Sequence, residues 1–276
     1  MCGIVGYVGH KEATEVLLEG LARLEYRGYD SAGVAVVDSE SNLSRVRRLG
    51  KVQELADAVE QSPLVGGTGI AHTRWATHGP ATDDNAHPHR NCDNTVAVVH
   101  NGIIEQCGVL RTKLQASGHI ITSQTDTELI PHLFTDLLKQ HKYDVRAALG
   151  ALRAQLQGAY SLVIMSTHFP DTLAIVRRRS PLVIGVGDKS MQVASDQLAF
   201  GRQVQQVLFV PDNSVGLVTS QGYQLFDAAN KPLRLAPARK VKAALSADKG
   251  HFAHYMLKEM YEQKRAITHS VAFYQL

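Results

Sequence analysis

Residues 2–9 read CGIVGYVG, an apolar run rich in β-branched side chains and interrupted by glycines. A short apolar run bounded by glycine is typical of a fully buried strand. We therefore predict a core strand over residues 3–8. Cys2 stands directly before this strand. Removal of Met1, which is normal before a small residue, makes Cys2 the first residue of the mature chain.

The patterns along the rest of the chain favour an α+β fold. They come as strands, then helices, then strands again, without the strict alternation of a doubly wound parallel sheet. We expect two sheets packed within helical layers. Helical spacing is found at 11–25, 51–60, 107–116, 126–140 and 144–156, and strand-like runs are found at 28–38, 43–48, 67–73, 95–100, 159–165, 172–176, 181–187, 191–194, 206–210, 214–218 and 222–226.

Composition excludes several classes of protein. The chain has 276 residues, 44% hydrophobic and 20% charged, a balance typical of globular proteins. The net charge of +3 does not favour a nucleic-acid or membrane partner. No stretch approaches the roughly 20 apolar residues that span a bilayer, and the start lacks a signal-peptide pattern. Three cysteines form no paired framework, which fits a cytoplasmic setting.

The composition changes near residue 228. Residues 1–227 carry the strand and helix patterns described above, and we predict that they form one domain. The segment that follows is basic and contains two prolines, and it leads into helical spacing near the end of the chain. We therefore predict that residues 228–276 form a tail or linker.

Cys2 has two interpretations. A mature N-terminal cysteine carries a thiol and a free α-amine, whose reference pKa of about 7.7–8.0 leaves part of it neutral near physiological pH. A neutral amine can take the proton of the thiol, so such a nucleophile carries its own base. The alternative is a small buried hydrophobic residue at the start of a strand.

Two charged positions suggest recognition of an amino acid. Arg74 stands where the strand in GIAHTRWATHG ends, and a guanidinium can pair with both oxygens of a carboxylate. Trp75 beside it can cover a small ligand. Asp126, within SQTDTELI, can hold an ammonium group. The alternatives are a surface ion pair for Arg74, core packing for Trp75, and a helix cap at Thr125 or Asp126.

Asn101 and Gly102 follow a predicted strand. An asparagine amide and a glycine backbone N–H can both donate to one developing oxyanion. The alternative is a hairpin turn, for which Asn-Gly is a preferred pair. Nearby, His87, His89 and Cys92 suggest a metal site, but no second Cys/His pair lies at suitable spacing. A structural role for these histidines is therefore preferred, and no metal is predicted.

Taken together, these segments resemble the class II glutamine amidotransferases, which are N-terminal-nucleophile enzymes. The resemblance is strongest to the hexosamine-forming branch, the glutamine–fructose-6-phosphate aminotransferases, and it covers residues 2 to about 227. The motifs that carry it occur in order along the chain: CGIVGYVG, GLARLEYRGYDSAGVAVVD, RRLGKVQEL, GGTGIAHTRWATHG, NAHPH, VVHNGIIE, TDTE, GAYSLVIM, SPLVIGVG and ASDQLA. The implied fold is a four-layer αββα sandwich of two mostly antiparallel sheets.

The resemblance also implies a role for each matching residue. Cys2 matches the nucleophile, and Asn101 and Gly102 match the oxyanion donors. Arg74 matches the clamp on the α-carboxylate of glutamine, and Asp126 the partner of its α-ammonium. Trp75 matches the closing lid, and Thr77 with His78 matches the loop beside the substrate. His87 matches a supporting loop histidine. Arg27 with Gly28 matches a turn packed near the nucleophile. Arg179 stands where the family usually has glycine.

The implied activity is hydrolysis of L-glutamine to glutamate and ammonia, with neither a metal nor an organic cofactor. Residues 228–276 resemble a linker toward an isomerase domain that this sequence lacks, so a separate domain or chain is the expected ammonia acceptor. One alternative is a silent glutamine-binding or interaction module, which follows if Met1 is retained. Another is a related amidase acting on a different amide, against which the pair Arg74 and Asp126 argues.

Overall fold

The computed structural model describes residues 2–233, 235, 239–240, 251–252 and 255–274. The chain divides into two compact units, Met1–Ala243 and Ala244–Leu276. Within the second unit, α6 covers Tyr255–Tyr274, in agreement with the helical spacing there. The predicted division at residue 227 between a glutaminase domain and a tail stays a prediction. No helix in the described part of the chain is both long and apolar enough to cross a membrane.

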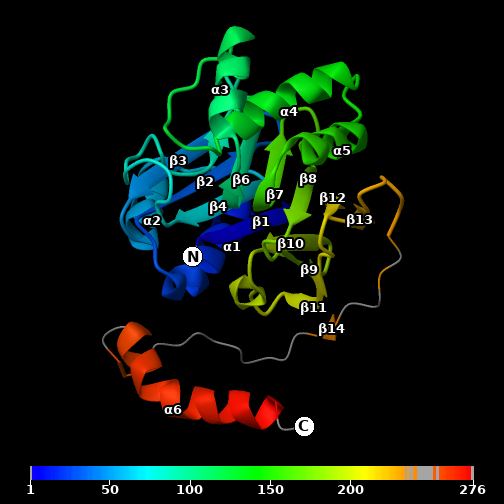
Figure 1. Ribbon diagram of the computed structural model, residues 1–276. Helices are drawn as coiled ribbons and strands as arrows, with labels where there is room; N and C mark the ends of the chain where they lie inside the picture. The colour runs from blue at the N-terminus through cyan, green and yellow to red at the C-terminus, as the bar shows by residue number, and fades with distance from the viewer. Residues whose placement is uncertain (1, 234, 236–238, 241–250, 253–254, 275–276) are drawn as a thin grey trace. The chain divides into compact units, whose positions relative to one another are not determined.

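Two antiparallel sheets form the centre of the first unit (Figure 1). The larger sheet has eight strands, in the order β14 (Arg239–Lys240), β11 (Val204–Phe209), β9 (Val183–Gly187), β10 (Ser190–Ala194), β1 (Gly3–Gly9), β4 (Thr68–Arg74), β2 (Ser31–Val37) and β3 (Leu43–Leu49). The smaller sheet has six, in the order β13 (Gly222–Phe226), β12 (Ser214–Thr219), β8 (Thr172–Arg178), β7 (Gly158–Ser166), β6 (Val96–Ile104) and β5 (His89–Arg90).

Helices cover the outer faces of both sheets. α1 (Ala13–Leu24) and α2 (Val52–Gln61) pack on the larger sheet in one apolar cluster. The smaller sheet is covered by α3 (Cys107–Ala116), α4 (Leu129–Gln140) and α5 (Val145–Gln155) in a second cluster. A third cluster lies between the sheets. The predicted four-layer αββα sandwich is therefore confirmed.

The run that begins the sequence lies at the centre of the larger sheet. β1 pairs with β10 on one side and with β4 on the other, so its backbone is bonded along both edges. Ile4, Val5 and Tyr7 are fully buried, as the apolar run predicts. An added Cβ at Gly3 would lie 2.6 Å from the hydroxyl of Thr73, which explains the glycine there. Cys2 thus stands at the end of a rigid central strand.

Two local predictions were wrong. The interpretation of Asn101-Gly102 as a hairpin turn fails because β6 continues through both residues to Ile104, paired with β7. The helix expected from residue 126 begins at Leu129, and its N-cap residue Glu128 makes no side-chain cap. The hydroxyl of Thr125 accepts the Glu128 N–H at 3.3 Å just before the helix. Asp126 does not cap the helix, and its carboxylate accepts the Ile104 N–H instead.

Candidate active site

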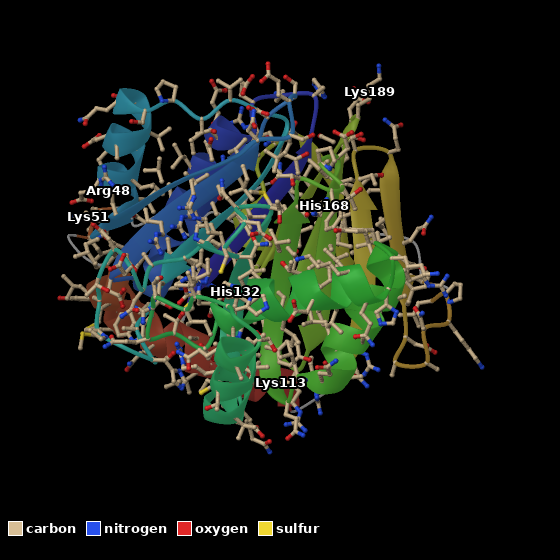
Figure 2. All side chains as sticks on the ribbon, turned by 90° about the horizontal axis from the view of Figure 1, so that it is seen from above. Arg48, Lys51, Lys113, His132, His168 and Lys189 are labelled. Atoms are coloured by element: carbon tan, nitrogen blue, oxygen red, sulfur yellow. The ribbon has the colours of Figure 1, made fainter. Side chains whose placement is uncertain are left out.

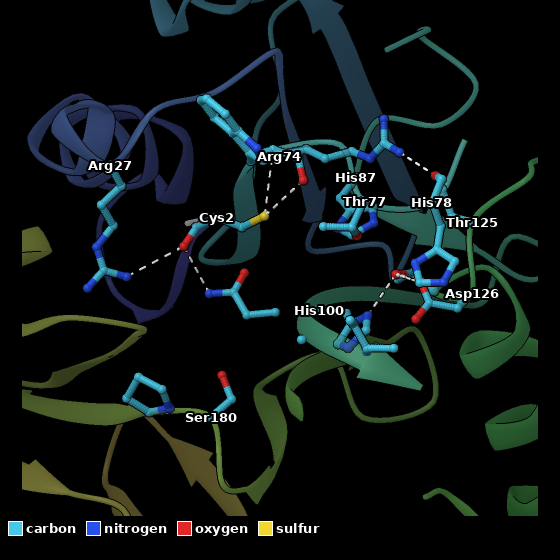
Figure 3. Close-up of a pocket in the computed structure, with 16 residues that line it drawn as sticks. Cys2, Arg27, Arg74, Thr77, His78, His87, His100, Thr125, Asp126 and Ser180 are labelled. Atoms are coloured by element: carbon cyan, nitrogen blue, oxygen red, sulfur yellow. Dashed lines mark hydrogen bonds between the residues drawn. The ribbon is translucent and has the colours of Figure 1, made fainter. Parts of the chain in front are cut away.

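A cavity of about 460 Å³ lies at the end of β1 (Figure 3). All but one of the predicted site residues line it, and the exception is Gly28. The lining also includes residues that the sequence did not single out for this site: His100, Ile103, Thr125, Thr127, Ser180 and Pro181. Segments from both sheets and from the loops after β4 and before α4 therefore meet at one place.

The sulfur of Cys2 faces this cavity and contacts the backbone of Trp75. The Trp75 N–H donates to Sγ at 3.1 Å, and Sγ lies 3.6 Å from the carbonyl oxygen of the same residue. Burial raises the pKa of the Cys2 thiol above its ordinary value, and the Trp75 N–H opposes that rise. The thiol form is therefore favoured at neutral pH, and a base is needed to activate it.

Asn101 is oriented by a histidine that the sequence did not identify. Its Oδ1 lies 2.9 Å from Nε2 of the fully buried His72, and its Nδ2 donates to the carbonyl oxygen of Cys2 at 3.0 Å. With Oδ1 facing His72, the amide N–H groups face Cys2 and the cavity. The one feature of the sequence that could have identified His72 is its position on the strand β4, two residues before Arg74.

Gly102 fits a backbone position that excludes other residues. Its φ is 119°, in the region that favours glycine. An added Cβ would collide with the carbonyl oxygen of Ala159 on the neighbouring strand. The glycine therefore lets β6 pass close to β7 while it lines the cavity.

Arg74 organises the loop after β4. Its guanidinium donates to the carbonyl oxygens of His78 at 2.5 Å, Gly79 at 3.1 Å and Pro80 at 3.1 Å. It also lies 3.9 Å from a carboxylate oxygen of Asp30. In Figure 3 the guanidinium points toward His78 and away from the sulfur of Cys2. The side chain thus fixes the loop that brings Thr77 and His78 to the cavity.

Trp75 is half exposed, at 53%, and its ring covers Gly28. Gly28 has a φ of 85°, and an added Cβ would lie 2.5 Å from the indole. Gly28 therefore supports Trp75 from outside the cavity. Arg27 next to it pairs with Asp196 at 2.6 Å and donates to the carbonyl oxygen of Cys2 at 3.5 Å. This turn therefore packs beside Cys2.

Asp126 lies on the far side of the cavity from β1. Its Oδ2 accepts the Ile104 N–H at 2.9 Å, and the side chain is almost fully buried. One carboxylate oxygen is thereby fixed by β6. The carboxylate remains close to Thr127, whose hydroxyl lies 3.5 Å from Oδ1.

Buried histidines pack behind the cavity. The rings of His72 and His87 lie 4.3 Å apart, and His100 Nδ1 lies 2.8 Å from the hydroxyl of Thr127. Burial lowers the pKa of His72 to about 3, and burial also lowers the pKa values of His87 and His100. These imidazoles are therefore neutral at physiological pH, and the group positions its neighbours rather than supplying charge.

The triad His87, His89 and Cys92 does not come together. His87 lines the cavity, whereas His89 Nε2 faces the hydroxyl of Thr125 at 3.0 Å. Cys92 is exposed and lies near His132, with Sγ 3.8 Å from Nδ1. The rings of His87 and His89 lie 5.0 Å apart, and His89 lines a second cavity together with Cys92, but the three side chains do not converge as one set of ligand atoms.

Comparisons with known proteins agree with this arrangement. Residues 72–202 match a family described as a glutamine amidotransferase domain. Over 98% of its length the chain is 48% identical to glutamine–fructose-6-phosphate aminotransferase (isomerizing) of Vibrio cholerae, and 48% identical to the protein of that name from Escherichia coli strain K12. The chain spans 44% of the length of each relative.

Solved structures show the same fold. The glutamine phosphoribosylpyrophosphate amidotransferase of B. subtilis matches with a TM-score of 0.70 at 26% identity, over 84% of this chain and 50% of that one. A glutamine aminotransferase class-II domain protein of silicibacter pomeroyi matches with a TM-score of 0.55 at 17% identity, over 82% of this chain and 99% of that one.

Proposed function

The chain belongs to the class II glutamine amidotransferases, and from that premise we propose that its first unit hydrolyses L-glutamine to glutamate and ammonia with Cys2 as the nucleophile. The single observation that carries this proposal is the surroundings of the Cys2 sulfur. It faces a cavity at the end of a central strand, with the Trp75 N–H at 3.1 Å and the Asn101 amide bonded to the Cys2 carbonyl oxygen at 3.0 Å.

The first chemical step uses both functional groups of a mature Cys2. The α-amine takes the thiol proton, and the sulfur forms a bond to the side-chain amide carbon of glutamine. The amide oxygen becomes an oxyanion, which the amide of Asn101 and the backbone of Gly102 stabilise. A base is needed here because burial raises the pKa of the thiol. The reference pKa of the α-amine, about 7.7–8.0, leaves part of it unprotonated.

The second step releases ammonia. The α-ammonium returns its proton to the departing nitrogen as the carbon–nitrogen bond breaks, which leaves a γ-glutamyl thioester on Cys2. Water then attacks the thioester carbon, with the amine again accepting a proton. Glutamate leaves and the thiol is regenerated. The cycle consumes one water and needs no redox partner.

Recognition of the amino-acid head group is assigned to the rest of the cavity. Arg74 is the proposed partner of the α-carboxylate, with Thr77 and His78 on the loop that it holds. Asp126 is the proposed partner of the α-ammonium, since one of its oxygens is fixed by Ile104. Trp75 is the proposed lid, which its exposed ring above Gly28 supports. Arg27, Gly28 and His87 are proposed as supporting residues.

The use of the ammonia is a further part of the proposal. The curated relatives are aminotransferases more than twice the length of this chain. We propose that this domain supplies ammonia to a synthase or isomerase domain, or to a separate chain, that forms an amino sugar phosphate. A cytoplasmic setting stays a prediction from the cysteine content.

The direct test is glutamine turnover by the purified chain after N-terminal mass spectrometry has confirmed a free Cys2. We expect release of glutamate and ammonia, loss of turnover in Cys2→Ala, and labelling of Cys2 by a thiol-directed glutamine analogue. A correctly folded protein with a free Cys2 and no turnover contradicts the proposal.

Two comparisons separate the alternatives. Retention of Met1 together with glutamine binding but no turnover indicates a silent binding module. Equal turnover of γ-amides that lack the α-carboxylate indicates an amidase of another specificity. We expect such amides to react far more slowly than glutamine, because they cannot use Arg74.

A further inference from the structure

A second cluster of nucleophilic and basic side chains lies outside the proposed active site. Cys92 precedes β6, and His119 follows α3. His132 lies on α4 and is labelled in Figure 2. One ligand atom from each residue lies within 4.8 Å of the others. No role in glutamine hydrolysis has been assigned to these three residues.

The atoms converge as metal ligands do. Nδ1 of His119 lies 3.2 Å from Nδ1 of His132, and Sγ of Cys92 lies 3.8 Å from the same His132 nitrogen. Zinc bonds of about 2.0–2.1 Å to nitrogen and 2.3 Å to sulfur in a tetrahedron separate two nitrogens by about 3.4 Å, and sulfur from nitrogen by about 3.6 Å. The observed separations are close to both values.

The outer contacts of the histidines leave both Nδ1 atoms available. His119 Nε2 lies 3.0 Å from the carboxylate of Asp136, which fixes the proton on Nε2 and frees Nδ1 as a lone pair. His132 is buried, and within the described residues its Nε2 has no partner, so Nδ1 carries the polar contacts of that ring. The two ring nitrogens, 3.2 Å apart, are joined either by the Nδ1–H of His132 as a hydrogen bond or by a cation that replaces that proton.

The sulfur of Cys92 is held by the backbone of Ile120. The backbone N–H of Ile120 donates to Sγ of Cys92 at 3.3 Å, and its carbonyl oxygen lies 3.7 Å from the same atom. The cavity beside the cluster is lined by Cys92, Ile120, Thr122, Glu128 and His132, and its lining also includes Arg45, Arg47 and Arg90. A water in that cavity can supply a fourth ligand.

We propose that Cys92, His119 and His132 form a binding site for a divalent transition metal of the zinc class, with Asp136 orienting His119. Thiolate and imidazole ligands favour zinc over magnesium or calcium, which prefer oxygen. The ion joins the loop before β6, the segment after α3 and the helix α4, and so stabilises the side of the domain from which Asp126 extends. This proposal departs from the expectation of no metal, which was drawn from short sequence spacings. Here Cys92 and His119 are 27 residues apart, and His119 and His132 are 13 residues apart, so the sequence pattern did not reveal the site.

The test uses Co²⁺ on the full chain after treatment with a chelator. We expect one bound ion per chain, with a thiolate-to-cobalt charge-transfer band, tetrahedral d–d bands, and displacement by Zn²⁺. Cys92→Ser removes the charge-transfer band, and His119→Gln weakens binding. Asp136→Asn weakens binding by about 10–100-fold without removing the band, as expected for loss of an orienting partner.

Matched controls separate this site from Cys2, whose thiol and amine can themselves chelate a metal. Cys2→Ala and Cys107→Ser are expected to keep the band, and Cys92→Ser is expected to keep its glutaminase activity. No cobalt band in the wild type, a band that survives Cys92→Ser, or a band lost only in Cys2→Ala overturns the proposal. Circular dichroism of each variant establishes that a lost band does not reflect an unfolded chain.

Discussion

The histidines of this protein form two groups that differ in what their ring nitrogens face. Behind Cys2, the Nε2 of His72 faces the amide of Asn101, and the Nδ1 of His100 faces the hydroxyl of Thr127. At the edge near α4, His119 and His132 face each other and a cysteine sulfur. In the first group each hydrogen-bonded imidazole orients a different neighbour, whereas in the second two ring nitrogens and a sulfur converge.

The difference shows that residue type alone does not identify a metal site. His87, His89 and Cys92 are close in sequence, yet their ligand atoms do not converge: His89 Nε2 faces the hydroxyl of Thr125, and the sulfur of Cys92 faces His132. Cys92, His119 and His132 are far apart in sequence, yet their ligand atoms lie within 4.8 Å of one another. If the histidines behind Cys2 position the proposed oxyanion donor Asn101, substitutions there should change catalysis. Substitutions in the cluster of Cys92, His119 and His132 should not.

The largest expected effect is on the catalytic amide. Asn101→Ala removes one proposed oxyanion donor, and we expect kcat for glutamine hydrolysis to fall by about 10²–10³-fold, or about 2.7–4 kcal/mol, with little change in KM. Steady-state glutamate release at saturating glutamine measures this. An equal fall caused by Cys92→Ser would erase the distinction between the two groups.

A graded control tests positioning by His72. His72→Leu removes the hydrogen bond that orients Asn101, and loss of about 1 kcal/mol predicts a fall in kcat of about fivefold with KM unchanged. His72→Gln keeps an N–H donor and is expected to recover part of that loss. A change confined to KM would contradict the positioning role.

The next effect is on stability in acid. The pKa of His72 is lowered from 6.5 to about 3 by burial, so the folded protein binds this proton only at lower pH than the unfolded chain does. His72 therefore stabilises the fold fully above about pH 6.5, and this contribution is lost as the pH falls toward 3. Between pH 6 and 4.5 it makes the free energy of unfolding fall by about 1.4 kcal/mol per pH unit.

His72→Gln removes that titration. Urea unfolding measured across this pH range should show a slope shallower by about 1.4 kcal/mol per pH unit than in the wild type. Cys107→Ser serves as the matched variant that leaves the histidines unchanged. An identical slope in wild type and His72→Gln would show that His72 is not held neutral by burial.

The smallest expected effect is on stability, and it comes from Arg179, which lies outside both groups of histidines. It measures what a change of backbone conformation alone contributes. Arg179 has a φ of 67°, a conformation that costs a residue with a Cβ about 1–2 kcal/mol. Arg179→Gly relieves this cost but adds freedom to the unfolded chain, so a net stabilisation of up to about 1 kcal/mol is expected. Thermal unfolding measures it, and a lower melting temperature would show that the arginine side chain compensates for the strain.

The sequence predicted the layered fold because its signals are local. Apolar runs such as residues 3–8 and the helical spacing at 107–116 reflect burial that each segment needs wherever it packs. The order of these segments excluded an alternating parallel sheet. Most of the residues predicted for the active site also meet at one cavity, because the family motifs mark them.

What the sequence missed depends on contacts between distant segments. The role of His72 follows from a bond to Asn101 on the other sheet, and the edge cluster joins three separate segments. Local spacing also left a hairpin turn open for Asn101-Gly102, whereas such a pair can continue a strand when a neighbouring carbonyl passes close to the glycine. Such outcomes are set by packing, which single-segment patterns do not encode.

The place of β1 in the larger sheet has a consequence for synthesis on the ribosome. One edge of β1 bonds to β10, whose residues 190–194 emerge about 185 residues later. At roughly 5–20 residues per second, that interval lasts roughly 10–40 s. Throughout it the start of the nascent chain lacks one of its two flanking strands. We expect an aminopeptidase to have this period in which to remove the initiator methionine, before β10 pairs with β1.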